Sequence, residues 1–441
     1  MNDGVVVHRG RVLHLTGDPA ADGKCEYHAD GALVVDGGGR VAAFGAAPEL
    51  LPALGDGARI IDHRDALIVP GFVDTHVHYP QCGVLASWGA QLLDWLERYT
   101  FPAEGRFDDA ELARATADFF LDELLRNGTT TALVFGTVHP QSVDAFFEAC
   151  RVRDLRMLCG KVMMDCHAPD YLLDSPETSF DQSAALIERW HGRGRLAYAV
   201  TPRFAPTSSS AQLDAAGRLL AAYPGVRLQT HLSENVDECR WVAELFPQCA
   251  DYVDVYDRHG LLGGLSVFAH ALHLSEREWG RLAQSGSAVS FCPRSNLFIG
   301  SGLFDLATAD RYGVRVGLGS DVGGGDSFSI PAVVNEGYKV LQLGGQSLDP
   351  MRALYLATLG GARVLGLDNE IGNFELGKEA DFVVLDPDCT PLMSHRTSRC
   401  TTIEETLFAM TMLGDDRLVA STWSLGREVH RRDIAGNGDT G

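Results

Sequence analysis

The chain lacks the features that mark secreted and membrane-spanning proteins. Its ten cysteines include no CxxC pair, so neither a disulfide framework nor a structural zinc knuckle is indicated. No segment approaches the roughly 18 consecutive apolar residues of a membrane span. The N-terminal segment MNDGVVVHRGRVLHL has no apolar signal region. We therefore expect a cytoplasmic protein with no membrane partner.

Basic residues are also scarce. The 441 residues include 37 basic and 59 acidic ones, for a formal charge of −22. An acidic surface repels phosphate backbones, so nucleic acid is a poor candidate partner, and a solvated acidic surface is the simpler interpretation. With 45% apolar and 22% charged residues, the composition is that of a globular protein, and the length suggests one large domain plus a smaller one.

Both ends of the chain have the pattern of short strands. Near the N-terminus these segments are GVVVHRGRVLHL, GALVVDGGGRVAAFG and ARIIDHRDALIV, with a turn at the glycines 37–39. Near the C-terminus, EADFVVLDP and STWSLGREVHRR are again strand-like. We predict that residues 1–68 and 371–441 pair into one small β domain formed by both chain ends.

Residues 69–370 alternate between apolar strands and amphipathic helices. One predicted helix covers Asp109–Asn127 and is followed by Gly128, a residue type that often ends helices. Eight such units predict an α/β fold with a TIM-type (β/α)8 barrel. The eight predicted strands are Leu67–Asp74, Thr130–Phe135, Met157–Met164, Leu196–Val200, Val226–Thr230, Ser266–Ala269, Ala288–Phe291 and Val314–Gly319.

Polar residues follow the predicted strands at the end where such barrels build their active sites. These residues are His76 and His78 after the first strand, Arg203 after the fourth, His231 after the fifth, His270 after the sixth and Asp321 after the eighth.

The HxH pattern of His76 and His78 indicates a metal site. Alternate side chains of an extended segment point the same way, so the two imidazoles are directed at one point. His231 and Asp321 would complete a set of three nitrogens and one carboxylate, with a position left for water. Each residue alone is more often structural, but the combination favours metal. The segment LAYAVTPRFAPT lacks the lysine that often bridges two metals, so we favour one metal ion.

Two further residues at this rim are candidates for catalytic roles beside the metal. Glu234 lies three residues past His231, where a carboxyl group can move a proton between water and a ring nitrogen. The alternative is an ordinary loop or helix-start carboxylate. His270 can hold the attacking water, act as another ligand, or be a hydrogen-bonded core histidine.

Together, PGFVDTHVH, THLSEN, FAHALHLS and GLGSDVG resemble the deaminase branch of the amidohydrolase superfamily. The segments HVHYPQ, LLDWLERYTFPAE, TPRFAPTSS and FCPRSNLFIGSGLFDL are similar to those of bacterial guanine deaminases. The resemblance covers nearly the whole chain. It implies a barrel fold, one zinc ion per subunit, a homodimer, and hydrolytic conversion of guanine to xanthine and ammonia in purine catabolism or salvage.

The resemblance also implies roles for particular residues. His76, His78, His231 and Asp321 would be the metal ligands, with Asp321 also taking part in catalysis. Glu234 would be the proton shuttle and His270 would position the attacking water. Gln81, Arg203 and Phe204 would bind the purine.

The sequence allows two other interpretations and excludes a third. A related enzyme of the same barrel class could act on another amino- or chloro-substituted heterocycle. A non-catalytic barrel scaffold is a second alternative, although every candidate catalytic residue is present. The unrelated zinc deaminases with an HxE…PCxxC signature are excluded, because the Cys292-Pro293 pair has no second cysteine after it.

Overall fold

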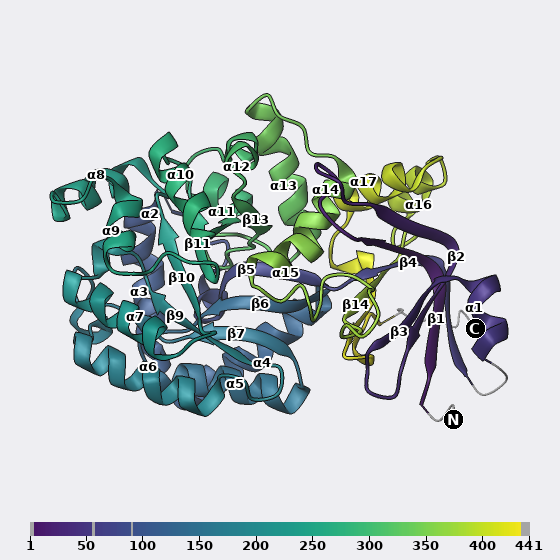
Figure 1. The fold of residues 1–441 in the computed structure, drawn as a ribbon, viewed down its shortest axis with the longest axis horizontal. Coiled ribbons are helices and arrows are strands. Elements are labelled where there is room, and N and C mark those ends of the chain that lie inside the picture. Colours follow the sequence, from purple (N-terminus) through teal and green to yellow (C-terminus); the bar gives the residue numbers. More distant parts are fainter. Residues whose placement is uncertain (1–3, 55–57, 90, 434–441) are drawn as a thin grey trace, which may run out of the picture.

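The computed structural model describes residues 4–54, 58–89 and 91–433. The remaining positions of the predicted small β domain (1–3, 55–57 and 434–441) and residue 90 of the predicted barrel lie outside the described residues. The described chain forms two sheets that stand side by side, one of them ringed by helices (Figure 1). No helix in these ranges is long and apolar enough to cross a membrane.

The larger sheet is the predicted barrel. Its strands are parallel and almost wholly buried, as expected when both faces of a sheet are covered. A short extra strand, β8 (Val162–Met163), pairs with β9. The eight strands, in order around the sheet, are β5 (Phe72–His78), β6 (Thr129–Phe135), β7 (Arg156–Gly160), β9 (Ala197–Pro202), β10 (Arg227–Leu232), β11 (Ser266–His270), β12 (Ala288–Phe291) and β13 (Arg315–Leu318).

Backbone hydrogen bonds join the first and last strands of this sheet. The amide of Asp321, just after β13, donates to the carbonyl of His76 at 2.9 Å, and the amide of His78 donates to the carbonyl of Val322 at 3.0 Å. These bonds bring β13 back to β5, so the sheet closes into a barrel. They also fix Asp321 beside the two histidines of the HxH segment.

Helices cover the outside of the barrel (Figure 1). The predicted helix at 109–127 is confirmed: α4 covers Ala110–Arg126, the Asp109 side chain caps it by accepting from the Glu111 amide at 2.8 Å, and Gly128 follows with a φ of +82°. The other covering helices are α5 (Pro140–Arg153), α6 (Pro176–Trp190), α7 (Ser210–Ala222), α8 (Val236–Leu245), α9 (Tyr252–Arg258), α10 (Glu276–Ser285), α11 (Pro293–Phe298), α12 (Leu306–Tyr312) and α13 (Ile330–Leu343).

Short helical segments fill the long connections. Those between β5 and α4 are η1 (Tyr79–Val84), α2 (Leu92–Trp95), η2 (Leu96–Thr100), α3 (Phe101–Glu104) and η3 (Gly105–Asp108). Those elsewhere are α1 (Ala47–Leu54), η4 (Asp170–Leu172), η5 (Ala205–Thr207), α14 (Pro350–Tyr355), η6 (Leu356–Gly360), α15 (Gly361–Val364), α16 (Pro391–Thr397), α17 (Ile403–Leu413) and η7 (Asp416–Leu418).

The smaller sheet is built from both ends of the chain, as the strand patterns predicted. Its N-terminal strands lie on one side and its C-terminal strands on the other, and β4 pairs with both β1 and β14. The strands are, in sheet order, β16 (Arg427–Arg431), β15 (Val419–Ser424), β14 (Phe382–Leu385), β4 (Arg59–Pro70), β1 (Val6–Leu15), β2 (Cys25–Val35) and β3 (Val41–Ala46).

A buried ion-pair network joins the barrel to the smaller sheet. Arg195, which precedes β9 of the barrel, donates to Glu379 at 2.7 Å and also pairs with Asp381, just before β14. These side chains are at most 6% exposed. A third bond runs from Arg195 to the Ser424 hydroxyl of β15 at 2.8 Å.

Two details differ from the predicted strands. The segment Leu67–Asp74 is not one strand: residues up to Pro70 belong to β4 of the small sheet, and the barrel strand begins at Phe72. Between them, a Cβ at Gly71 would lie 2.1 Å from Oγ1 of Thr130, so only glycine fits there. Similarly, the segment Met157–Met164 is not one strand: it is divided between β7 and β8, and Lys161 lies between them.

Candidate active site

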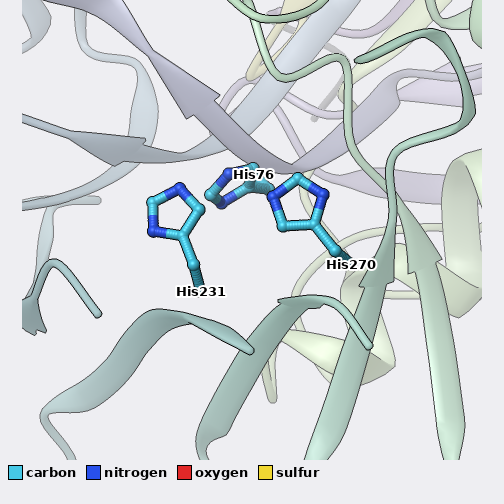
Figure 2. A group of neighbouring side chains, drawn as sticks. All are labelled: His76, His231 and His270. Atoms are coloured by element: carbon cyan, nitrogen blue, oxygen red, sulfur yellow. The ribbon is translucent and has the colours of Figure 1, made fainter. Parts of the chain in front are cut away.

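Three histidine rings come together at the carboxyl end of the barrel strands. His76 and His78 end β5, and His231 lies near the end of β10. The Nε2 atom of His78 is 3.3 Å from Nε2 of His76 and 3.3 Å from Nε2 of His231. His270, at the end of β11, turns its ring toward the same space, as Figure 2 shows for His76, His231 and His270.

Asp321 brings a carboxylate to this group. Its Oδ1 atom lies 3.2 Å from Nε2 of His76 and 3.3 Å from Nε2 of His78. Its backbone has a φ of +50°, a left-handed conformation that aspartate tolerates better than most residues. The backbone bond to His76 across the barrel seam holds the carboxylate there. The four predicted ligand residues therefore surround one small space.

The electrostatics of the histidines favour metal binding. Burial lowers the pKa of His76, lowers that of His78 to about 3, and lowers that of His231 well below its usual value. Neutral imidazole is the form that coordinates metals. Nδ1 of His231 bonds the Arg203 carbonyl at 2.7 Å, which directs its free Nε2 at the cluster.

These donors fit a divalent cation. Burial alone would raise the pKa of Asp321, but the neighbouring histidines hold it well below its usual range, so the residue is a carboxylate. Three nitrogens and one oxygen match the ligand types that zinc prefers. Cys292 also lies close: its sulfur and one ligand atom each of His76 and Asp321 are all within 4.8 Å of one another. The cluster is a possible metal site.

Glu234 stands at the edge of the cluster, two residues past β10. Its Oε2 atom is 3.4 Å from Nε2 of His270, and its Oε1 accepts a hydrogen bond from Ser301 at 3.3 Å. The next helix fixes its backbone, because the Glu238 carboxylate accepts from the Glu234 amide at 2.8 Å. Burial, together with the negative charge of Asp321, raises the pKa of Glu234 well above its usual value. Its carboxyl group is therefore suited to hold and release a proton.

His270 is held by a residue that the sequence did not point to. Its Nδ1 lies 2.8 Å from Oδ1 of Asn296, in α11, which leaves Nε2 toward Glu234 and Asp321. Both His270 and Ala271 have left-handed backbones, with φ of +72° and +54°. Such strained conformations are concentrated at functional sites, where surrounding contacts hold them.

A pocket opens beside the cluster. Its walls include the three predicted substrate-binding residues, Gln81, Arg203 and Phe204, and it is also lined by His78, Leu92, Trp95, Leu96, His231, Glu234, Ser295, Ile299, Asp321 and Gly324. The apolar side chains come mainly from α2 and η2. The structure thus brings all nine predicted site residues to one place.

Sequence reasoning missed one charged residue here. Glu104, at the end of α3, is fully buried and accepts hydrogen bonds from both Gln81 and Arg203. Lys161 is also fully buried, and its ammonium group pairs with Asp174 rather than with a residue of the cluster.

The chain is similar to known proteins over nearly its whole length. A family model described as "Amidohydrolase family" matches residues 67–429. Guanine deaminase of Escherichia coli is 54% identical over 92% of this chain and 92% of that protein. Its solved structure aligns with a TM-score of 0.94 and 51% identity, over 97% of this chain and 100% of that one. A guanine deaminase structure from C. acetobutylicum with bound guanine in the active site aligns with a TM-score of 0.88 and 29% identity, over 97% and 100% of the chains.

Proposed function

The chain belongs to the amidohydrolase family, and on that premise we propose that it is a hydrolytic deaminase that converts guanine to xanthine and ammonia. One observation carries the proposal: a cluster of side chains able to hold a metal ion and a protonatable carboxyl group border the same pocket as Arg203, Gln81 and Phe204. The similarity to guanine deaminases over more than nine-tenths of the chain supports the choice of substrate.

We assign His76, His78, His231 and Asp321 as ligands of one zinc ion per subunit. A bound zinc ion would lower the pKa of a coordinated water toward about 7 and so make hydroxide available near neutral pH. The four side chains supply the required nitrogen and oxygen donors, and the hydrogen bond of His231 to the Arg203 carbonyl sets its tautomer for this role.

The proton transfers fall to the carboxyl groups. Asp321 orients the attacking water and accepts its proton. Glu234 protonates the ring nitrogen beside C2 of guanine, which makes that carbon easier to attack. After the C–O bond forms at C2, the proton held by Asp321 passes to the amino group, the C–N bond breaks and ammonia leaves, and the new hydroxyl returns its proton to Glu234 as the C2 carbonyl forms. His270, fixed by Asn296, holds the attacking water in line with C2.

Guanine suits the donors that the pocket presents. Arginine carries only hydrogen-bond donors, and guanine offers the acceptors O6 and N7 on one edge. Adenine places an amino group where O6 would be, so a donor of Arg203 would face a donor. An unpaired buried polar group costs about 1–3 kcal/mol, and sites built to bond a polar group reject analogues that lack it. The Phe204 ring offers a face for stacking against the purine.

We also propose that the enzyme lies in the cytoplasm, acts in purine catabolism or salvage, and forms a homodimer. These proposals rest on the likeness to guanine deaminases and on the absence of disulfides among the described cysteines.

A substrate panel tests the proposal. The zinc-loaded protein is incubated with guanine, adenine, cytosine and a chlorinated triazine, and ammonia release and, for the triazine, chloride release are measured. We expect rapid release from guanine alone. Release from a different ring, with guanine inert, would contradict the assignment of Arg203, Gln81 and Phe204 while leaving the hydrolytic chemistry of the metal cluster in place.

A further inference from the structure

The connection between β5 and α4 supplies a buried carboxylate that contacts two walls of the pocket at once. Glu104 ends α3, and its side chain is 0% exposed. It accepts a hydrogen bond from Nε2 of Gln81 at 2.8 Å. It also accepts from Nη1 of Arg203 at 3.0 Å and 2.7 Å through its two oxygens.

The charge of Glu104 is matched by one cation. Within the described ranges, the ion pair with Glu104 is the only one that Arg203 makes. The Arg203 guanidinium also lies over the ring of Phe101, with 5.6 Å from Cζ to the ring centre, and Phe101 begins the same short helix. The segment Phe101–Glu104 therefore holds the guanidinium in two ways: Glu104 pairs with its charge, and the Phe101 ring packs against its flat face.

The contacts of Glu104 determine which hydrogen-bonding atoms of Gln81 and Arg203 remain available to a substrate. An ionised carboxylate only accepts hydrogen bonds, so Gln81 must turn its amide NH2 toward Glu104. Among the residues that the structure describes, no hydrogen bond engages the Gln81 carbonyl oxygen, which lies close to the backbone at Gly323, where a Cβ would be 2.5 Å from that oxygen. Nη1 of Arg203 is occupied by Glu104, and no hydrogen bond in the described part of the chain engages its Nη2 or Nε.

We propose that Glu104 is a positioning residue that sets the hydrogen-bond pattern of the pocket, with Gln81 fixed as an acceptor and Arg203 fixed as a donor. This pattern selects a heterocycle that carries acceptors on one edge and an N–H group facing Gln81. The proposal rests on the proposed deaminase function. Glu104 acts through these two side chains and does not itself touch the substrate.

The variant Glu104→Gln tests the role. A glutamine keeps the size of the side chain but places an NH2 group against a donor. If that donor is the Gln81 amide, the amide would turn over; if it is Nη1 of Arg203, the guanidinium would lose a hydrogen bond and its counter-charge. We expect the KM for guanine to rise about 10- to 100-fold, the loss of one to two buried hydrogen bonds, with a smaller change in kcat. Zinc content and the unfolding temperature should stay near wild type. Glu97→Gln, the same change at an exposed position of η2, is the matched control and should alter none of these.

A double-mutant cycle distinguishes positioning from general support. If Glu104 acts partly through Gln81, then Glu104→Gln should raise KM less in a Gln81→Ala background than in the wild type. Equal effects in both backgrounds, or an unchanged KM in Glu104→Gln, would overturn the proposal. If Glu104→Gln does not fold, the exchanged pair Gln81→Glu with Glu104→Gln decides: recovery of folding and KM supports the role, and folding without recovery of KM overturns it.

The wild-type assay separates this proposal from the function on which it rests. Absence of ammonia release from guanine by wild type contradicts the proposed function alone. The variants are then assayed on the heterocycle that the wild type does hydrolyse, where the same rise in KM is expected from loss of the fixed pattern.

Discussion

Replacing Glu234 with glutamine separates proton transfer from metal binding. The amide has the same shape, and its carbonyl oxygen can still accept the bond that Ser301 gives to Oε1 at 3.3 Å. No predicted metal ligand is changed. The amide cannot, however, carry a proton between water and the ring.

The expected loss of activity follows from this geometry. Positioned proton transfer contributes roughly 10²- to 10⁴-fold to a rate, or about 2.7–5.5 kcal/mol of activation free energy. Glu234 is required to move a proton in both halves of the reaction, so we expect kcat to fall by at least the upper value. The zinc content of Glu234→Gln should equal that of wild type.

Steady-state ammonia release and metal analysis of the same sample measure both quantities. Glu244→Gln is the matched control, because Glu244 is an exposed carboxylate ten residues away on α8. A Glu234→Gln protein that keeps zinc and more than about a tenth of its wild-type kcat would refute the role of Glu234, given the usual contribution of such groups. Loss of zinc together with activity would instead assign Glu234 to the metal site.

Three further outcomes are expected elsewhere in the chain. Arg203→Ala should lower kcat/KM for guanine about 10- to 100-fold through lost buried hydrogen bonds, with zinc retained; equal loss of zinc and guanine use would mark a structural arginine. Arg195→Ala should lower the free energy of unfolding by about 3–5 kcal/mol, the cost of breaking a buried ion pair, whereas exposed Arg193→Ala should not; equal denaturant midpoints would contradict this. Burial lowers the pKa of His8 to about 3 from an unfolded value of 6.5, so its contribution to stability is present above pH 6.5 and is lost as pH falls toward 3. The free energy of unfolding, measured with denaturant between pH 7 and 5, should therefore fall less for His8→Gln than for wild type or for the exposed-site control His395→Gln. Identical changes with pH in all three proteins would count against the burial argument.

The barrel and the cluster could be predicted because local patterns determine them. Apolar runs covered on both faces identify parallel strands, and the geometry of such barrels places every strand's carboxyl end at one rim. His76, His78, His231, His270 and Asp321 each follow such a run, so their convergence required no knowledge of distant contacts.

Other features depend on contacts between distant segments. The run Leu67–Asp74 is apolar up to Val73, and nothing in it shows that Leu67–Pro70 pairs with β14 while Phe72 starts the barrel. Its division at Gly71 is fixed by the approach of Thr130, some sixty residues later.

The role of Glu104 in the pocket could not be predicted, for a similar reason. A glutamate in a helical segment is usually solvated, and its burial follows only from the approach of Arg203, 99 residues along the chain. Asn296, which orients His270, carried no sequence signal either. Residues that act through a functional side chain lie outside the strand-end pattern that revealed the cluster.

The most direct test of the central claim is ammonia release from guanine before and after metal removal. The protein is depleted with a chelator, its zinc content is measured, and zinc is returned in steps. We expect the depleted protein to be inactive and its activity to return in proportion to bound zinc, reaching its maximum at one ion per subunit. Full activity in the depleted protein, or zinc bound at one per subunit with no release from guanine, would contradict a zinc-dependent guanine deaminase.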